Sequence, residues 1–122
     1  MFDLEPEEAR ELLTIALMAI GQNRFQSAAK ILAALERFRP NEAALAVARG
    51  ILLISKHDFQ GAVDYIDDDG LKRFPDSAML KAFKGMAFLR MERKSEARVW
   101  LEEAANQSAD PAAAQLARDL LV

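Results

Sequence analysis

The feature of this chain that most constrains its fold is a set of residues that recur at intervals of 34 to 36 positions. Ala16, Gly50 and Gly85 each lie in the middle of an apolar stretch. The other markers with this spacing are Phe25 and Phe59, then Ala28, Ala62 and Ala97, then Pro40, Pro75 and Pro111. Such periods are typical of stacked helix pairs, because a single pair cannot bury its apolar face alone.

The composition favours helices throughout. The chain has 23 alanines and 16 leucines but only 11 β-branched residues, a ratio that favours helix over strand. Its 122 residues are enough for one domain. We therefore predict an all-α domain over residues 1–122, an α-solenoid of three helix-turn-helix repeats with a C-terminal capping helix. The repeats are placed at residues 9–41, 42–76 and 77–110, and the cap at 111–121.

Individual helices are expected at residues 6–21, 25–38, 42–55, 59–68, 76–91, 94–107 and 111–121. Prolines 6 and 111 fit first-turn positions, where a missing N–H costs nothing, and Asp110 fits an N-cap. Asn41 and Asp76 are expected to cap in the same way. Gly70 is predicted to end the fourth helix in a left-handed conformation.

Charge and composition exclude several classes of function. There are 16 basic and 19 acidic residues, a net charge of −3, which argues against a nucleic-acid partner. With no cysteine and one histidine, His57, the chain offers neither a disulfide scaffold nor a zinc site. The longest apolar runs are six residues long, too short to cross a membrane, and the start lacks the pattern of a secretory signal. We expect a cytoplasmic protein.

No arrangement of catalytic residues stands out. His57 falls in an expected turn, and no serine lies in a nucleophile elbow. The acidic run at residues 67–70 places Tyr65 at the first ligand position of a calcium loop, which does not fit that motif. No glycine-rich phosphate loop is present. We expect a binding protein without enzymatic activity, cofactor or metal.

The predicted binding surface is a concave groove formed by the first helix of each repeat. Its inward-facing positions are all apolar: Leu13, Leu17, Ile20, Val47, Ile51, Ile54, Ala82, Met86 and Leu89. An apolar groove suits the apolar face of an amphipathic helix, whereas a charged peptide tail needs basic partners. The alternative is that these residues only fill the core of a tightly wound stack.

Two stretches, residues 12–20 and 78–91, are apolar almost all round, so we expect them to be covered on both sides. The second cover could be a partner, a second copy, or residues 1–4. Trp100, the only tryptophan, is expected to pack against the final helix, with an interface anchor as the alternative.

The recurring markers resemble the tetratricopeptide repeat (TPR), in which a small residue in the first helix meets an alanine in the second. Residues 33–43 (AALERFRPNEA) and 88–91 (FLRM), together with the size, resemble the small three-repeat proteins of bacterial type III secretion. These include needle-subunit chaperones and proteins of plant-pathogen Hrp systems. The match has departures, since Arg49 and Lys84 stand where the repeat usually has leucine.

This resemblance implies a cytosolic chaperone that holds an amphipathic helix of a secreted filament subunit in its groove, together with a small helical co-chaperone. Masking that helix would prevent premature polymerisation. Two alternatives remain at this point: a generic TPR scaffold that binds a peptide, and a self-associating homodimer without a client.

Overall fold

The computed structural model describes residues 4–107 and 109–122, and all regular structure in them is helical. The helices are α1 (Pro6–Gly21), α2 (Phe25–Phe38), α3 (Ala43–Ser55), α4 (Phe59–Tyr65), a π-helical turn η1 (Ile66–Gly70), α5 (Leu71–Arg73), α6 (Ala78–Arg90), α7 (Lys94–Ala105) and α8 (Pro111–Leu120). The all-α prediction is confirmed, and most helix ends lie within two residues of those predicted. No helix in these residues is long and apolar enough to cross a membrane.

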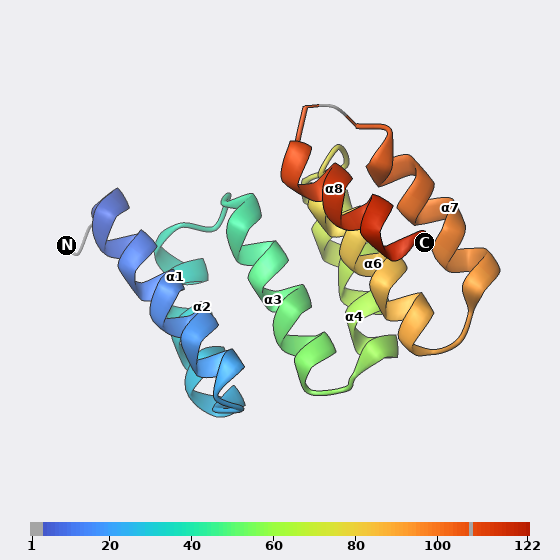
Figure 1. Cartoon of the computed structure of the whole chain (residues 1–122). Coiled ribbons are helices and arrows are strands. Elements are labelled where there is room, and N and C mark those ends of the chain that lie inside the picture. Colours follow the sequence, from blue (N-terminus) through green and yellow to red (C-terminus); the bar gives the residue numbers. More distant parts are fainter. Residues whose placement is uncertain (1–3, 108) are drawn as a thin grey trace.

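The helices pack in their order along the chain (Figure 1). α1 packs on α2, and α3 packs on both. α6 then packs on α3 and α4, pairs with α7, and is contacted by α8. As a result, α1 and α2 lie at one end of the row, and α7 and α8 lie at the other.

The same tight turn ends α1, α3 and α6. Its left-handed residue is Asn23, His57 or Glu92, with φ of 61°, 65° and 61°, at spacings of 34 and 35 residues. In each turn the next amide bonds a carbonyl five residues back, from Arg24 to Ala19, Asp58 to Leu53, and Arg93 to Phe88, at 2.8 to 2.9 Å. This is the Schellman arrangement, which satisfies the last carbonyls of a helix. The sequence repeat is thus matched by a repeated local structure.

The small residues lie where helices approach one another. Ala28, Ala62 and Ala97 are fully buried. A Cβ added to Gly85 would lie 2.6 Å from the side chain of Leu101 on α7. At Gly50 the nearest atom would be 3.7 Å away, on Ile66. Gly85 therefore lies at a closer helix contact than Gly50 does.

The structure tests the three predicted N-caps, Asn41, Asp76 and Asp110. Asp110 caps α8 as predicted, because its carboxylate accepts a hydrogen bond from the amide of Ala113 at 3.1 Å. The cap of α6 is Ser77, one residue after Asp76, and its hydroxyl accepts from the amide of Leu80 at 3.2 Å. The N-cap position of α3 is Glu42, not Asn41, and its side chain makes no capping bond.

The prediction for Gly70 was wrong. Its φ and ψ are both −57°, and the chain stays helical through η1 and α5 as far as Arg73. Asp69 pairs with Arg73 one turn later at 2.5 Å, which supports the continued helix. A Cβ on Gly70 would lie 3.2 Å from Leu80 of α6. Glycine is therefore used here for close packing on α6, not for a left-handed turn.

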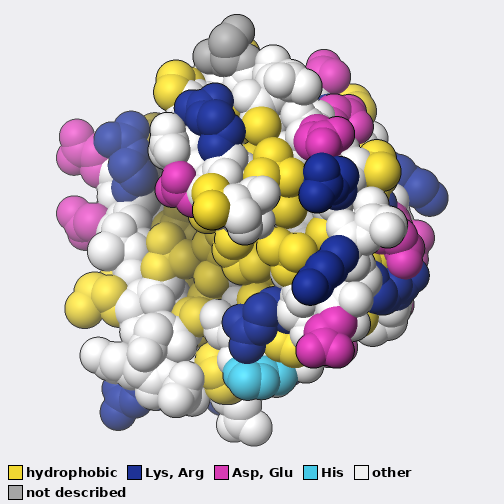
Figure 2. Space-filling view, turned by 45° about the vertical axis from the view of Figure 1, so that its right-hand side comes forward, with side chains coloured by type: hydrophobic (Ala, Val, Ile, Leu, Met, Phe, Trp, Pro, Cys, Tyr) yellow, Lys and Arg dark blue, Asp and Glu magenta, His cyan; other side chains and the backbone are white. Residues whose placement is uncertain are grey.

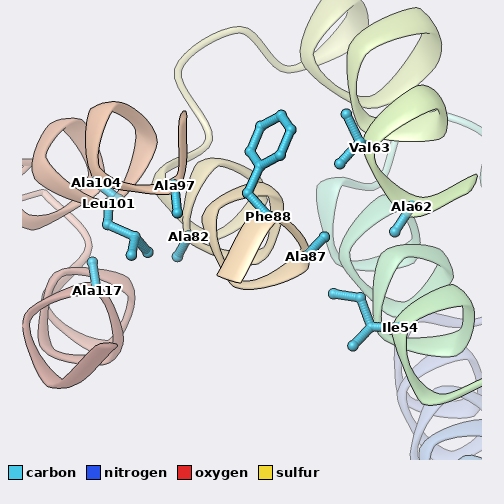
Figure 3. Close-up of a cluster of buried hydrophobic side chains, with 10 residues drawn as sticks. All are labelled: Ile54, Ala62, Val63, Ala82, Ala87, Phe88, Ala97, Leu101, Ala104 and Ala117. Carbon is cyan, nitrogen blue, oxygen red and sulfur yellow. The ribbon is translucent and has the colours of Figure 1, made fainter. Parts of the chain in front are cut away.

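The main hydrophobic core surrounds α6 (Figure 3). Leu101 and Ala104 of α7 and Ala117 of α8 lie on one side of α6, and residues of α3 and α4, such as Ile54, lie on the other. A second core cluster joins α1, α2 and α3 around Ala16, Leu32 and Leu52. The expected cover on both sides is therefore confirmed for α6.

α1 differs, because part of its apolar surface stays exposed. The relative exposures of Ile15, Leu17 and Met18 are 51%, 39% and 58%. Of the proposed N-terminal cover, Leu4 packs against the α1–α2–α3 cluster, and residues 1–3 lie outside the described part. Within the described residues, nothing packs over these three side chains.

Candidate binding groove

A hollow of about 360 Å³ opens between α1, α3 and the start of α6. Its lining is mostly apolar: Leu13, Leu17, Ala43, Ala44, Val47, Ala48, Ile51 and Met79, with Ser77 and Asp110 as polar members. Figure 2 shows a face that is hollowed at its centre, where hydrophobic side chains gather, with charged side chains around the rim. This shape and chemistry suit an apolar ligand surface.

Four of the nine predicted groove residues meet in this hollow: Leu13, Leu17, Val47 and Ile51. They come from α1 and α3, whose inward faces lie side by side because the two helices contact each other directly. Their apolar side chains stay accessible, and Leu17 is 39% exposed. This part of the predicted groove is brought together by the fold.

The other five do not line the hollow. Ile20, Ile54 and Ala82 are buried, at 5%, 7% and 0% exposure, so they belong to the core and are unavailable to a partner. Met86 and Leu89 are half-buried and pack against the core cluster around α6. The physical reasons differ: Ile20 is buried in the core cluster of α1, α2 and α3, and Ile54 in the cluster around α6. On α6 itself the reason is α8, which packs on both α6 and α7 and covers the part of α6 that would extend the groove. The groove is therefore shorter than predicted.

The residues that close the hollow are not among the nine predicted groove positions. Met79 lies seven residues, or about two helical turns, before Met86, and therefore on the same face of α6. That spacing could have identified it. Alanines 43, 44 and 48 give little signal, because alanine occurs everywhere in this chain. Asp110 reaches the hollow only through the loop before α8, which no local pattern predicts.

The two polar residues of the hollow are already used in folding. The hydroxyl of Ser77 and the carboxylate of Asp110 accept hydrogen bonds from amides at the starts of α6 and α8. A helix start carries partial positive charge, which these two groups offset. Both polar groups therefore already have a hydrogen-bond partner within the fold. The hollow therefore favours burial of apolar side chains over recognition of a charged group.

A smaller hollow of about 230 Å³ lies at the other end of the α1–α3 contact. It shares Leu13 and Ala44 with the larger one, so the two lie next to each other. Arg10 and Arg39 also line it. The guanidinium of Arg39 donates to Glu42 at 2.9 Å and to the carbonyl of Leu4 at 3.2 Å. Together the two hollows form a trough, which we call the α1–α3 groove, with arginines at one end.

A polar network lies apart from the groove, on α4, η1 and α5. Arg73 donates to Asp69 and to the carbonyl of Pro40 at 2.7 Å. Burial raises the pKa of Tyr65 above its ordinary value, and the neighbouring carboxylate of Asp69 raises it further. At neutral pH this tyrosine is therefore uncharged. The network ties η1 to the loop after α2.

Two of the three aspartates in the acidic run after α4 form ion pairs. Asp67 pairs with the buried ammonium of Lys84, which also lies 3.6 Å from the centre of the Trp100 ring. Asp69 pairs with Arg73. In the described residues, no group of three or more metal-ligating side chains gathers. Trp100 packs against the α6 core cluster, beneath a lysine that the sequence did not point to.

A comparison with known families shows which family the chain belongs to. The model of a family described as bacterial type III secretion protein (HrpB1_HrpK) matches residues 2–122. The chain belongs to this family. The resemblance to type III secretion proteins is thereby confirmed at the level of the family. No curated protein matches the chain.

Proposed function

We propose that this protein masks an amphipathic helix of a secreted filament subunit in the α1–α3 groove during type III secretion, as a cytoplasmic chaperone. The observation that carries the proposal is the hollow of about 360 Å³, in which eight of the ten lining residues are apolar. Membership of a type III secretion family supports the setting. An accessible hollow with a mostly apolar lining is a common kind of binding site.

The proposal includes a TPR-like arrangement of the helices. Support comes from the recurring turns at Asn23, His57 and Glu92 and from the packing of α1, α3 and α6 side by side. In such an arrangement the first helices of successive pairs line one concave face. Here α8 takes the place next to α6, which closes the row and confines the accessible groove to α1, α3 and the start of α6.

The chemistry of the groove favours a helix as its ligand. An amphipathic helix offers apolar side chains at i, i+3, i+4 and i+7, which need an elongated apolar trough and few polar partners. Met79 adds a flexible thioether that adapts to different side chains. A subunit that polymerises through such a helix must have it covered before export. Binding would be reversible and would involve no bond chemistry.

The test compares two neighbouring residues of α1. Leu17 lines the groove, whereas Met18 points to the outside and is 58% exposed. Each protein would be co-expressed with the filament subunit of the same secretion system, and the complex measured by light scattering. We expect Leu17→Asp and Ile51→Asp to lose the complex, because an unpaired carboxylate would be buried in an apolar site. Met18→Asp should keep it.

Circular dichroism would show whether each variant is folded. If folded Leu17→Asp and Ile51→Asp proteins bound the subunit as well as the unaltered protein does, the groove would not be the binding site. If the unaltered protein formed no complex with the subunit, the chaperone function itself would be wrong.

A further inference from the structure

A second exposed surface lies on α1, on the side away from the groove, with two apolar residues at its centre and polar residues at both ends. Five residues spaced by three or four positions form a straight stripe along the helix, which we call the outer seam: Glu8, Glu11, Ile15, Met18 and Gln22. All five are exposed, and Ile15 and Met18 are 51% and 58% accessible. This spacing is the one by which two helices pack side by side.

The equivalent positions on the other two first helices are all covered. On α3 they are Leu45, Arg49 and Leu52, and on α6 they are Leu80, Lys84 and Ala87, at the repeat spacing from Glu11, Ile15 and Met18. The leucines and Ala87 are buried. Arg49 pairs with Glu36 of α2 at 3.0 Å, and Lys84 pairs with Asp67 of η1. On both α3 and α6, the residues equivalent to the outer seam pack against the preceding helical segment of the row.

α1 has no preceding helix in the described residues, yet the middle of its seam is apolar. The opposite end of the row differs, since the exposed side chains of α8 include Gln115, Arg118 and Asp119. A terminal helix that meets only water is expected to carry a polar outer face. Ile15 and Met18 break this rule at the centre of the seam, which indicates that a helix covers them in the working protein.

The charges around the seam indicate which helix this is. Glu8 and Glu11 occupy its first half, and Arg24 follows the turn that ends it. Two copies of α1 in parallel would place these carboxylates against each other, which is unfavourable. In an antiparallel pair that crosses between Ile15 and Met18, Glu11 instead faces Gln22, and Glu8 lies near Arg24 of the other copy.

We propose that the outer seam of α1 pairs with the outer seam of a second copy of this chain, in an antiparallel two-fold dimer. Such a contact uses the same surface on both copies and closes on itself. It is one helix wide, so we expect a weak dimer that forms as the concentration rises. The groove lies on another side of α1 and stays open, so this inference does not depend on the proposed client.

The first test measures self-association by sedimentation velocity of the full chain over a range of concentrations. We expect a monomer–dimer equilibrium that Ile15→Lys combined with Met18→Lys weakens by roughly a hundredfold, because two apolar contacts are lost on each copy. The matched control is Val99→Lys on α7, a residue that is 60% exposed and lies far from the seam. A strictly monomeric unaltered protein, or equal loss in the control, would overturn the proposal.

The second test uses charge and leaves the apolar residues untouched. Glu8→Arg and Arg24→Glu each place two like-charged pairs in the antiparallel dimer, so each variant alone should associate more weakly. An equimolar mixture of the two should regain the affinity of the unaltered protein, since both pairs become attractive again. A mixture as weak as its components would show that the antiparallel pairing is wrong. Leu17→Asp should leave the dimer unchanged, which separates this test from that of the groove.

Discussion

α1 and α6 are both first helices of their pairs, yet their surroundings differ. α6 lies at the centre of the main core, with α7 and α8 on one side and α3 and α4 on the other. Even its lysines 81 and 84 are buried, at 8% and 6% exposure. Within the described part of the chain, α1 packs mainly on α2 and α3, and it leaves three large apolar side chains exposed. Residues 12–20 of α1 and 78–91 around α6 are both rich in apolar residues, so composition alone does not separate them.

The difference indicates where binding and stability reside. Other helices of the same chain cover α6, and its apolar residues are buried in the folded core. The region around α1 offers one apolar side to the groove, through Leu13 and Leu17, and another to the outer seam, through Ile15 and Met18. We infer that the α6 end holds the fold together and that the α1 end binds partners.

The largest expected effect is a loss of stability at the α6 end. Leu101 is 1% exposed and touches the place where α6 and α7 approach most closely. Leu101→Ala should lower the free energy of unfolding by about 3 kcal/mol, because it leaves a cavity in a packed core. Ile15→Ala on α1 should change it by less than about 0.5 kcal/mol. Urea unfolding followed by circular dichroism measures both, and equal effects would remove the contrast between the two ends.

Two glycine substitutions should have opposite signs. Gly85→Ala should cost about 2 kcal/mol, since the added methyl would lie 2.6 Å from the buried side chain of Leu101. Gly50→Ala should stabilise by about 0.5 kcal/mol, because its methyl would meet Ile66 at 3.7 Å and alanine favours helix. Thermal unfolding of the two variants checks the signs. Stabilisation by Gly85→Ala would mean that α6 and α7 can separate at little cost.

A third pair of variants compares equivalent positions on the two helices. Lys84 buries its stem and places its ammonium over Trp100, whereas Ile15 at the same repeat position is half exposed. Lys84→Ala should cost about 1 kcal/mol and change the fluorescence of Trp100. Ile15→Lys should leave both the stability and the fluorescence of the monomer unchanged. An unchanged emission spectrum in Lys84→Ala would contradict the contact between the ammonium and the indole ring.

The smallest effect concerns the repeated turn. Glu92 has a φ of 61°, a conformation that costs energy for residues with a Cβ, less for asparagine than for most, and that glycine adopts without strain. Glu92→Gly should therefore stabilise by about 0.5 kcal/mol, after allowing for the greater freedom of glycine in the unfolded chain. Asn23→Gly, at the same place after α1, should change stability less. Denaturant titrations of both variants, fitted with one common dependence of the unfolding free energy on denaturant concentration, measure the difference in stability between them. A larger gain at Asn23 would contradict this account of the turns.

Much of the fold could be predicted because its signals are local. The 34-residue period and the prolines at 6 and 111 placed the helices, and Asp110 was identified as a cap. Gly70 was misread, since only the position of Leu80 on another helix explains the glycine there. The sequence also did not explain why charged residues precede Gly50 and Gly85. Arg49 and Lys84 look like departures from the repeat until Glu36 and Asp67 are seen opposite them.

The groove was predicted in part for a similar reason. Leu13, Leu17, Val47 and Ile51 follow from the helix register, and they do meet in one hollow. The register also points to Ile20, Ile54 and Ala82, but these are buried by neighbours that a single helix cannot reveal. The extent of the groove depends on how far α8 covers α6, which is a tertiary contact between segments distant in sequence.

The most direct test of the central claim is site-specific photocrosslinking in the bacterium, with a photoreactive amino acid placed in turn at Leu17, Met18 and Val99. These three side chains are exposed and point into the groove, to the outer seam and to the far end of the row. We expect a covalent adduct with the secreted filament subunit from Leu17, an adduct between two copies of this protein from Met18, and neither from Val99. Filament-subunit adducts from Val99 or Met18 in the absence of one from Leu17 would contradict the assignment of the groove.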